Sequence, residues 1–182
     1  MKKPLIAAFL SAALLTGCST DAGIKTIKDV KMDELSSLKN TSAGSNSDVT
    51  SIISSLPGGE SYKEVAINGT SIGTTYGIKD GSTLTEEQFS DYWLNDDAIK
   101  RNFLYNAASI FTLIPNADKA AFTVESEMNQ SFSISRDQME KELPHSFDEY
   151  ANDQEMWKKE LTEFVNSEEK RTAFFEKYPI SE

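Results

Sequence analysis

The amino-acid sequence predicts an α+β domain with a small antiparallel sheet of about four strands, helices packed on one face of the sheet, and further helices at the C-terminus. Three observations support this prediction. Two alternating runs meet at Asn68-Gly69, a pair that strongly favours a β-hairpin. Apolar residues recur at helical spacing from Ile99 to Ile114, which indicates a long core helix. Two more alternating runs follow that helix.

The N-terminus has the pattern of a secretory leader, predicted over residues 1–17. Lys2 and Lys3 precede an apolar run from Pro4 to Leu15. The run fits the roughly 7 to 15 residues of a signal-peptide apolar region. It is shorter than the about 20 apolar residues that span a bilayer.

The only cysteine of the chain lies directly after this leader. Leu15, Thr16, Gly17 and Cys18 resemble the lipobox of bacterial lipoproteins. The resemblance implies cleavage between Gly17 and Cys18 and attachment of diacylglycerol to the Cys18 thiol. A buried structural thiol is the weaker alternative, because no core can form between an apolar leader and a polar segment. We therefore expect a protein held by acyl chains on the extracytoplasmic face of the cell membrane.

Composition narrows the classes of partner and cofactor. The chain has 18 Lys and Arg residues and 29 Asp and Glu residues, which gives a formal net charge of −11. Loss of Lys2 and Lys3 with the leader would change this net charge to −13. Such a charge repels nucleic acids and anionic headgroups. One cysteine excludes a disulfide framework and cysteine-based metal sites, so packing must hold the fold together. No cofactor is predicted.

A polar segment separates the predicted anchor from the predicted domain. Residues 18–47 are expected to be the lipidated cysteine and a flexible spacer, and residues 48–182 a single domain. The alternative for Ile24–Leu38 is a marginal helix, because its apolar spacing is weak. We expect Ser47, followed by Asp48, to cap the first helix of the domain, and Pro57 to end it.

The other elements follow from local signals along the chain. Strands are predicted at Tyr62–Asn68, Ile72–Ile78, Ala120–Val124 and Phe132–Ile134. The first two should form the antiparallel hairpin. The order of strands in the sheet is not readable from these patterns.

Helix starts are predicted where a polar side chain precedes an apolar helical pattern. These residues are Thr85, Asp96 or Asp97, and Ser135. The acidic and aromatic tail from Phe147 to Tyr178 should dock on the domain as one or two helices.

Three segments carry a family resemblance: "NAASIFTLIPNADKAAFTV" at 106–124, "SDVTSIISSLP" and "IGTTY". They resemble an uncharacterised domain family found in lipoproteins of Gram-positive bacteria. Related domains of that family are also fused to membrane-bound metallopeptidase sensors and anti-sigma-factor-like proteins. The resemblance covers residues 47–143 and not the tail, 144–182. The matching residues are structural, so the resemblance implies no catalytic residue.

Candidate catalytic groups are few. His145, the only histidine, follows Pro144 at a predicted helix end, which favours a surface or capping role. Acidic pairs at helix starts favour the helix dipole, whereas acid–base catalysis needs carboxyls about 5 to 10 Å apart across a cleft. The acidic pairs and sets are Glu86-Glu87, Asp96-Asp97, Glu168-Glu169, and Asp148, Glu149, Asp153 and Glu155. The stretch "DGSTLTEEQF" lacks the ligands of a calcium loop, so no metal site is predicted.

Two function classes remain open. Aromatic residues could line a peptide or glycan groove, but a role in the core is favoured for Tyr92, Trp93, Trp157, Phe174, Phe175 and Tyr178. The preferred hypothesis is a lipid-anchored, non-catalytic binding or sensing module of the cell envelope with a protein partner. The alternative is a lipid-anchored hydrolase that uses a carboxylate pair. Acids clustered in one pocket favour the hydrolase, and an apolar groove or exposed sheet edge favours binding.

Overall fold

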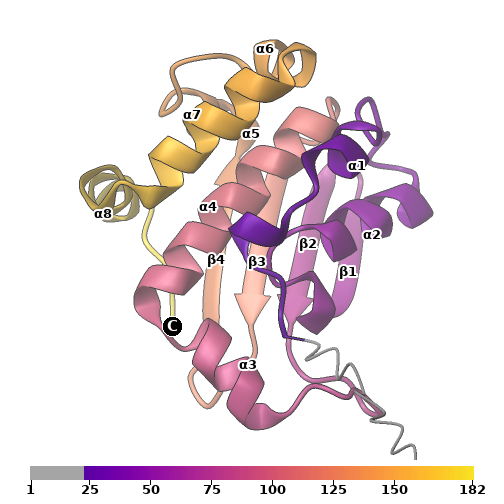
Figure 1. Ribbon diagram of the computed structural model, residues 1–182, viewed down its shortest axis with the longest axis vertical. Helices are drawn as coiled ribbons and strands as arrows, with labels where there is room; N and C mark the ends of the chain where they lie inside the picture. Colours follow the sequence, from indigo (N-terminus) through magenta and orange to yellow (C-terminus); the bar gives the residue numbers. More distant parts are fainter. Residues whose placement is uncertain (1–22) are drawn as a thin grey trace, which may run out of the picture.

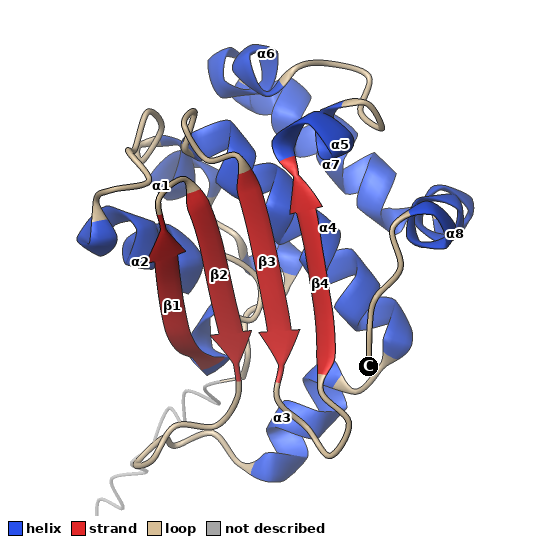
Figure 2. Ribbon diagram, turned by 180° about the vertical axis from the view of Figure 1, so that it is seen from behind, coloured by secondary structure: helices blue, strands red, loops and turns tan. Residues whose placement is uncertain are grey.

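Four strands and eight helices form the framework of the chain, which the computed structural model describes over residues 23–182 (Figure 1). The strands lie side by side in the order β1 (Tyr62–Asn68), β2 (Ser71–Tyr76), β3 (Lys119–Val124) and β4 (Gln130–Ser135). The helices are α1 (Met32–Ser36), α2 (Asn46–Ser55), α3 (Glu86–Trp93), α4 (Asp96–Leu113), α5 (Arg136–Glu140), α6 (Phe147–Asn152), α7 (Gln154–Asn166) and α8 (Glu168–Lys177). The α+β class is therefore confirmed, and Figure 2 shows the helices behind one face of the sheet.

The sheet is mixed, so the prediction of an antiparallel sheet is wrong at its centre. β1 pairs with β2 and β3 pairs with β4 in antiparallel hairpins, but β2 and β3 run parallel. The connection between β2 and β3 contains α3 and α4. A helix of 18 residues such as α4 spans about 27 Å, which is long enough to return the chain to the end of the sheet where β2 began.

Helix α4 is the centre of the core. Every residue from Asn102 to Ile114 is buried, as expected for a helix with neighbours on all sides. Phe103 stacks on Phe122 of β3, with ring centroids 5.4 Å apart. The Asn106 amide donates hydrogen bonds to the carbonyl oxygen of Pro57 (3.0 Å) and to the hydroxyl oxygen of Tyr76 (2.8 Å). These bonds tie α4 to the end of α2 and to β2.

Two of the predicted helix starts are confirmed and one is shifted. Thr85 and Ser135 each accept a hydrogen bond from the third amide of their helix in a capping box. The cap of α4 is not Asp96 or Asp97 but Asn95, whose Oδ1 accepts from the Asp97 amide at 3.1 Å. Adjacent side chains of similar capping preference explain the shift.

The C-terminal end of α4 is capped by a side chain that the sequence did not single out. Arg136, at the start of α5, donates from Nη2 to the carbonyl oxygens of Phe111 and Ile114, each at 2.7 Å. Its Nε donates to the Ala117 carbonyl oxygen at 2.9 Å. A cation at this position satisfies free carbonyls and complements the helix dipole.

Residues 24–47, predicted as a spacer, are folded against the domain. Ile24, Met32, Leu35 and Ala43 are buried, and Leu35 is fully covered. We call residues 24–43 the N-terminal strap. The apolar residues of the strap are too sparse to form a core alone, so the sequence did not predict that this segment is folded. In the structure these residues cover apolar surface of α4 and α7. The first helix after the strap is α2, which begins at Asn46, two residues earlier than the predicted cap position implies.

The tail docks on the domain as predicted, although as three helices, α6, α7 and α8, rather than one or two. Phe175 of α8 packs edge-on against Phe132 of β4, with ring centroids 5.3 Å apart. The buried Arg171 of α8 donates to the carbonyl oxygen of Val165 at 2.7 Å and also to Asp97 of α4. Among the described residues, no helix combines the length and apolar character needed to cross a bilayer.

Arg171 should stabilise the docked tail far more than its neighbour Arg101, which binds the same carboxylate. Arg171→Met is expected to lower the free energy of unfolding by about 1–3 kcal/mol, because the buried Val165 carbonyl loses its donor. Arg101→Met is the matched control: its contact with Asp97 (2.9 Å) is half-exposed, and such pairs contribute about 0.2–1 kcal/mol. Urea denaturation measures both. If both variants lost the same free energy of unfolding, the larger contribution expected from the buried Arg171 would be contradicted.

Candidate functional site

The residues proposed from the sequence do not come together in one place. Gly17 and Cys18 lie outside the described residues. His145 lies at the surface, with Nδ1 3.6 Å from Glu149 and Nε2 3.5 Å from Glu160. Its ring packs edge-on against Tyr150. These neighbours fit the surface role that the sequence favoured for His145.

The acidic pairs lie at helix starts, and several of their members cap helices or pair with arginine. Asp97 contacts both Arg171 and Arg101. Glu149 belongs to the capping box of α6, where hydrogen bonds from the Ser146 amide and hydroxyl hold the pKa of Glu149 below its ordinary value. Asp153 accepts from the third amide of α7. These contacts explain Asp97, Glu149 and Asp153 by their contribution to helix stability and docking.

Most of the aromatic candidates belong to the core. Trp93, Trp157, Phe174 and Phe175 are buried, while Tyr92 and Tyr178 are partly buried. The Tyr92 hydroxyl donates to the Lys25 carbonyl oxygen at 2.6 Å and so fastens the strap to α3. The structure confirms the prediction of a core role for the four buried aromatic residues, Trp93, Trp157, Phe174 and Phe175.

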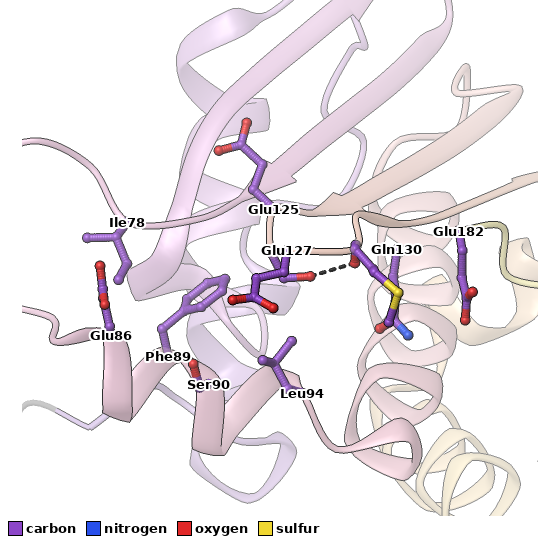
Figure 3. A pocket seen from close by; sticks show the side chains of 11 residues that line it. Ile78, Glu86, Phe89, Ser90, Leu94, Glu125, Glu127, Gln130 and Glu182 are labelled. Atoms are coloured by element: carbon purple, nitrogen blue, oxygen red, sulfur yellow. Dashed lines mark hydrogen bonds between the residues drawn. The ribbon is translucent and has the colours of Figure 1, made fainter.

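A hollow of about 710 Å³ opens at the carboxyl ends of the parallel strands β2 and β3. We call it the acidic hollow. Figure 3 shows side chains of α3 on one side of it, and Glu125, Glu127 and Gln130 on the other. Its lining residues are Ile78, Glu86, Phe89, Ser90, Leu94, Glu125, Ser126, Glu127, Met128, Gln130 and Glu182. The carboxyl ends of parallel strands are a common place for ligands, and the volume lies in the range of ligand sites.

The charges of the lining are all of one sign. Glu86, Glu125, Glu127 and Glu182 contribute carboxylates, and the lining contains no lysine, arginine or histidine. Among the cations of residues 23–182, Lys63 is the one within ion-pair distance of these acids, with its Nζ 2.6 Å from Glu125. The acids come from three distant parts of the chain, because only Glu125 and Glu127 are near each other in the sequence. No spacing in the sequence could have revealed the whole set, and only Glu86 was among the predicted pairs.

Two strongly exposed apolar side chains border the same hollow. Leu94 is 51% exposed and Met128 is 69% exposed, and they are the large apolar side chains classed as exposed in the described part of the chain. Both line the acidic hollow, together with the nearly buried Phe89. Exposed apolar side chains that gather at one concavity indicate a surface for a partner or ligand.

The hydroxyl groups of the hollow have no base beside them in the lining. Its hydroxyls are those of Ser90 and Ser126, with no histidine or lysine in the lining to act as their base. Ser126 Oγ donates to the Met128 carbonyl oxygen at 2.5 Å (dashed line in Figure 3). Over residues 23–182, no group of three or more His, Cys, Asp or Glu side chains is arranged to hold a metal ion.

A second hollow of about 710 Å³ lies between the strap, α4 and α7. It is lined by both signs of charge, with Lys28, Arg101 and Lys158 against Asp91. Buried Asn102 and Tyr105 form part of its wall. Desolvation by burial raises the pKa of Tyr105 to about 12, so this hydroxyl stays neutral at physiological pH.

Together, the fold and the hollow define a mixed-sheet α+β domain with an acidic surface hollow that has an apolar rim. The chain belongs to the family described as Domain of unknown function (DUF4825), whose model matches residues 35–135, more than half of the chain. The match begins within the strap and ends with β4, so the helical tail lies beyond it. No curated protein and no solved structure matches the chain.

Proposed function

We propose that this protein is a lipid-anchored, non-catalytic binding or sensing module on the extracytoplasmic face of the cell membrane. The lipobox resemblance at Cys18 supports the anchor, and the apolar leader before it supports export. The resemblance to domains fused to membrane-bound sensors supports a role in the envelope. A protein partner fits this role better than a nucleic acid, since the chain is strongly acidic.

The observation that carries the binding function is the acidic hollow. Its one-signed lining and the exposed Leu94 and Met128 offer both charge and apolar area to a ligand. Burying these side chains against a partner would remove apolar surface from water, which favours association. In the lining, no nucleophile is paired with a base, so binding is the chemistry that these residues support best.

One observation favours the alternative of a hydrolase. Four carboxylates gather in a single concavity, which is where an acid and a base would have to lie. The ion pair of Glu125 with Lys63 and the apolar rim fit binding better. A hydrolase panel tests this alternative: turnover that Glu127→Gln abolishes would replace the proposed function.

The binding function predicts position-dependent cross-linking in living cells. A photo-reactive residue at Met128 should yield a discrete adduct with an envelope component, because Met128 faces the hollow and is 69% exposed. The matched control is the same residue at Glu169, an exposed position in the first turn of α8 that does not line the hollow. Adducts of equal yield from both positions, or from neither, would count against the acidic hollow as the binding site. Immunoblotting measures the yield.

A further inference from the structure

We infer that the ligand of the acidic hollow is a basic amphipathic peptide segment, one that alternates Lys or Arg with large apolar residues. This inference rests on the proposed binding function and names the chemistry of the ligand. It follows from the charge, the apolar rim and the shape of the surface.

The negative charge of the lining favours a positively charged ligand. Glu86, Glu127 and Glu182 have no cation within ion-pair distance among the described residues, while Glu125 is already paired with Lys63. Like charges brought together in one concavity repel each other, and a cationic ligand relieves this repulsion. An anionic ligand or an anionic lipid surface would increase it. The formal net charge of −11 attracts the same cation from a distance.

The apolar rim requires more than a cation. Leu94 and Met128 both line the hollow but come from different elements, one at the end of α3 and the other in the turn between β3 and β4. A simple cation would leave both exposed to water. A large apolar side chain between them would cover both, and methionine adapts its shape to varied partners. The ligand therefore needs apolar and basic groups next to each other.

The shape favours an extended segment over a compact molecule. A neighbouring hollow of about 340 Å³ shares Gln130 and Glu182 with the acidic hollow and continues toward Phe175 and Ile180. Gln130, at their junction, has a buried Oε1 without a hydrogen-bond partner. If the Gln130 side chain turned outward, this oxygen would accept from the amide of a peptide that crosses from one hollow to the other, which would offset the cost of leaving it without a partner.

Fluorescence anisotropy tests the inference with the lipidated protein in phosphatidylcholine nanodiscs and empty nanodiscs as the blank. The probe is a labelled 12-residue peptide of alternating Lys and Leu. We expect saturable binding that weakens with salt, and no comparable binding of peptides with Glu in place of Lys or Ser in place of Leu. Equal binding of the Ser peptide, or no binding of the Lys-Leu peptide, would overturn the inference.

Two double variants with the same change in net charge distinguish the effect of the carboxylates in the hollow from the effect of the overall charge on peptide affinity. Glu86→Gln with Glu127→Gln should weaken the affinity about tenfold, because two charge contacts are lost. Glu168→Gln with Glu169→Gln, on the exposed first turn of α8, should change it less than about twofold, as expected for screened charges. Circular dichroism melts confirm that each variant is folded. Equal weakening would mean that only net charge attracts the peptide, and the inference would fail.

Three further outcomes are decisive. If spermidine displaces the peptide at equal concentration, a compact polyamine is the ligand and the peptide assignment is wrong. If the Met128 cross-link forms in cells while the Lys-Leu peptide does not bind, the ligand chemistry is wrong but the binding function stands. If the peptide binds but no cross-link forms at Met128 in cells, the basic-peptide chemistry holds in vitro, but the hollow loses its support as the binding site in cells.

Discussion

Cys18→Ala is expected to abolish incorporation of radiolabelled fatty acid and to remove the protein from the normal lipoprotein pathway. Only the thiol of Cys18 can receive the diacylglyceryl group, and the chain has no other cysteine. The lipoprotein signal peptidase should then fail to process the leader, which stays attached or is trimmed irregularly. Labelling of intact cells, followed by fractionation and immunoblotting, measures both effects. Wild type should label and sediment with membranes.

Ser19→Ala is the control for Cys18→Ala, because it changes the next residue and keeps the thiol. It should label like wild type. The described domain begins beyond this site and depends on no disulfide, so a trimmed Cys18→Ala protein should melt at the wild-type temperature. Lipid incorporation by Cys18→Ala, or wild type secreted with a free thiol, would refute the lipobox hypothesis and the location that depends on it.

Gly58→Ala is expected to lower the free energy of unfolding by about 2–5 kcal/mol, the sum of backbone strain and overpacking. Gly58 has φ +82°, a left-handed conformation that favours glycine. An added Cβ would lie 2.9 Å from Cη2 of Trp93 and still closer to Cζ2. Trp93 is fully buried and its indole N–H donates to the Ser61 hydroxyl at 2.8 Å, so the ring cannot move aside cheaply.

Gly69→Ala separates the two contributions. Gly69 also has a left-handed backbone, with φ +63°, but an added Cβ there meets no atom within 4 Å. It should therefore cost only the strain, about 1–2 kcal/mol. Urea denaturation of both variants gives the overpacking contribution by difference. If Gly69→Ala were as costly as Gly58→Ala, the contact with Trp93 would not be the cause.

The elements that the sequence predicted well are those specified by neighbouring residues. Asn68-Gly69 specifies a hairpin through its backbone preferences, and Thr85 and Ser135 specify helix starts through a hydrogen bond three residues away. Such signals need no knowledge of the rest of the fold. The stop at Pro57 was predicted in the same way, but the close approach of Trp93 to Gly58 was not, because α3 lies far along the chain.

The features that the sequence did not reveal depend on contacts between distant segments. Nothing in β2 or β3 alone states that they run parallel, since either direction buries the same alternate residues. Leu35 looked like a weakly apolar residue in a polar segment until α7 and α4 covered it. The acidic hollow likewise exists only where Glu86, Glu127 and Glu182 meet after folding.

The strap has a further consequence for how a ligand would reach the protein. Ile24 is buried and lies six positions after Cys18, and six residues span at most about 22 Å when fully extended. Lys25 contacts α3, so the described part of the chain begins at the end of the molecule that carries α3 and the acidic hollow (Figure 1). With lipid on Cys18, the hollow would sample a thin layer beside the bilayer. A partner's juxtamembrane segment would already occupy that layer, so it would meet the hollow at a local concentration that a freely diffusing peptide lacks.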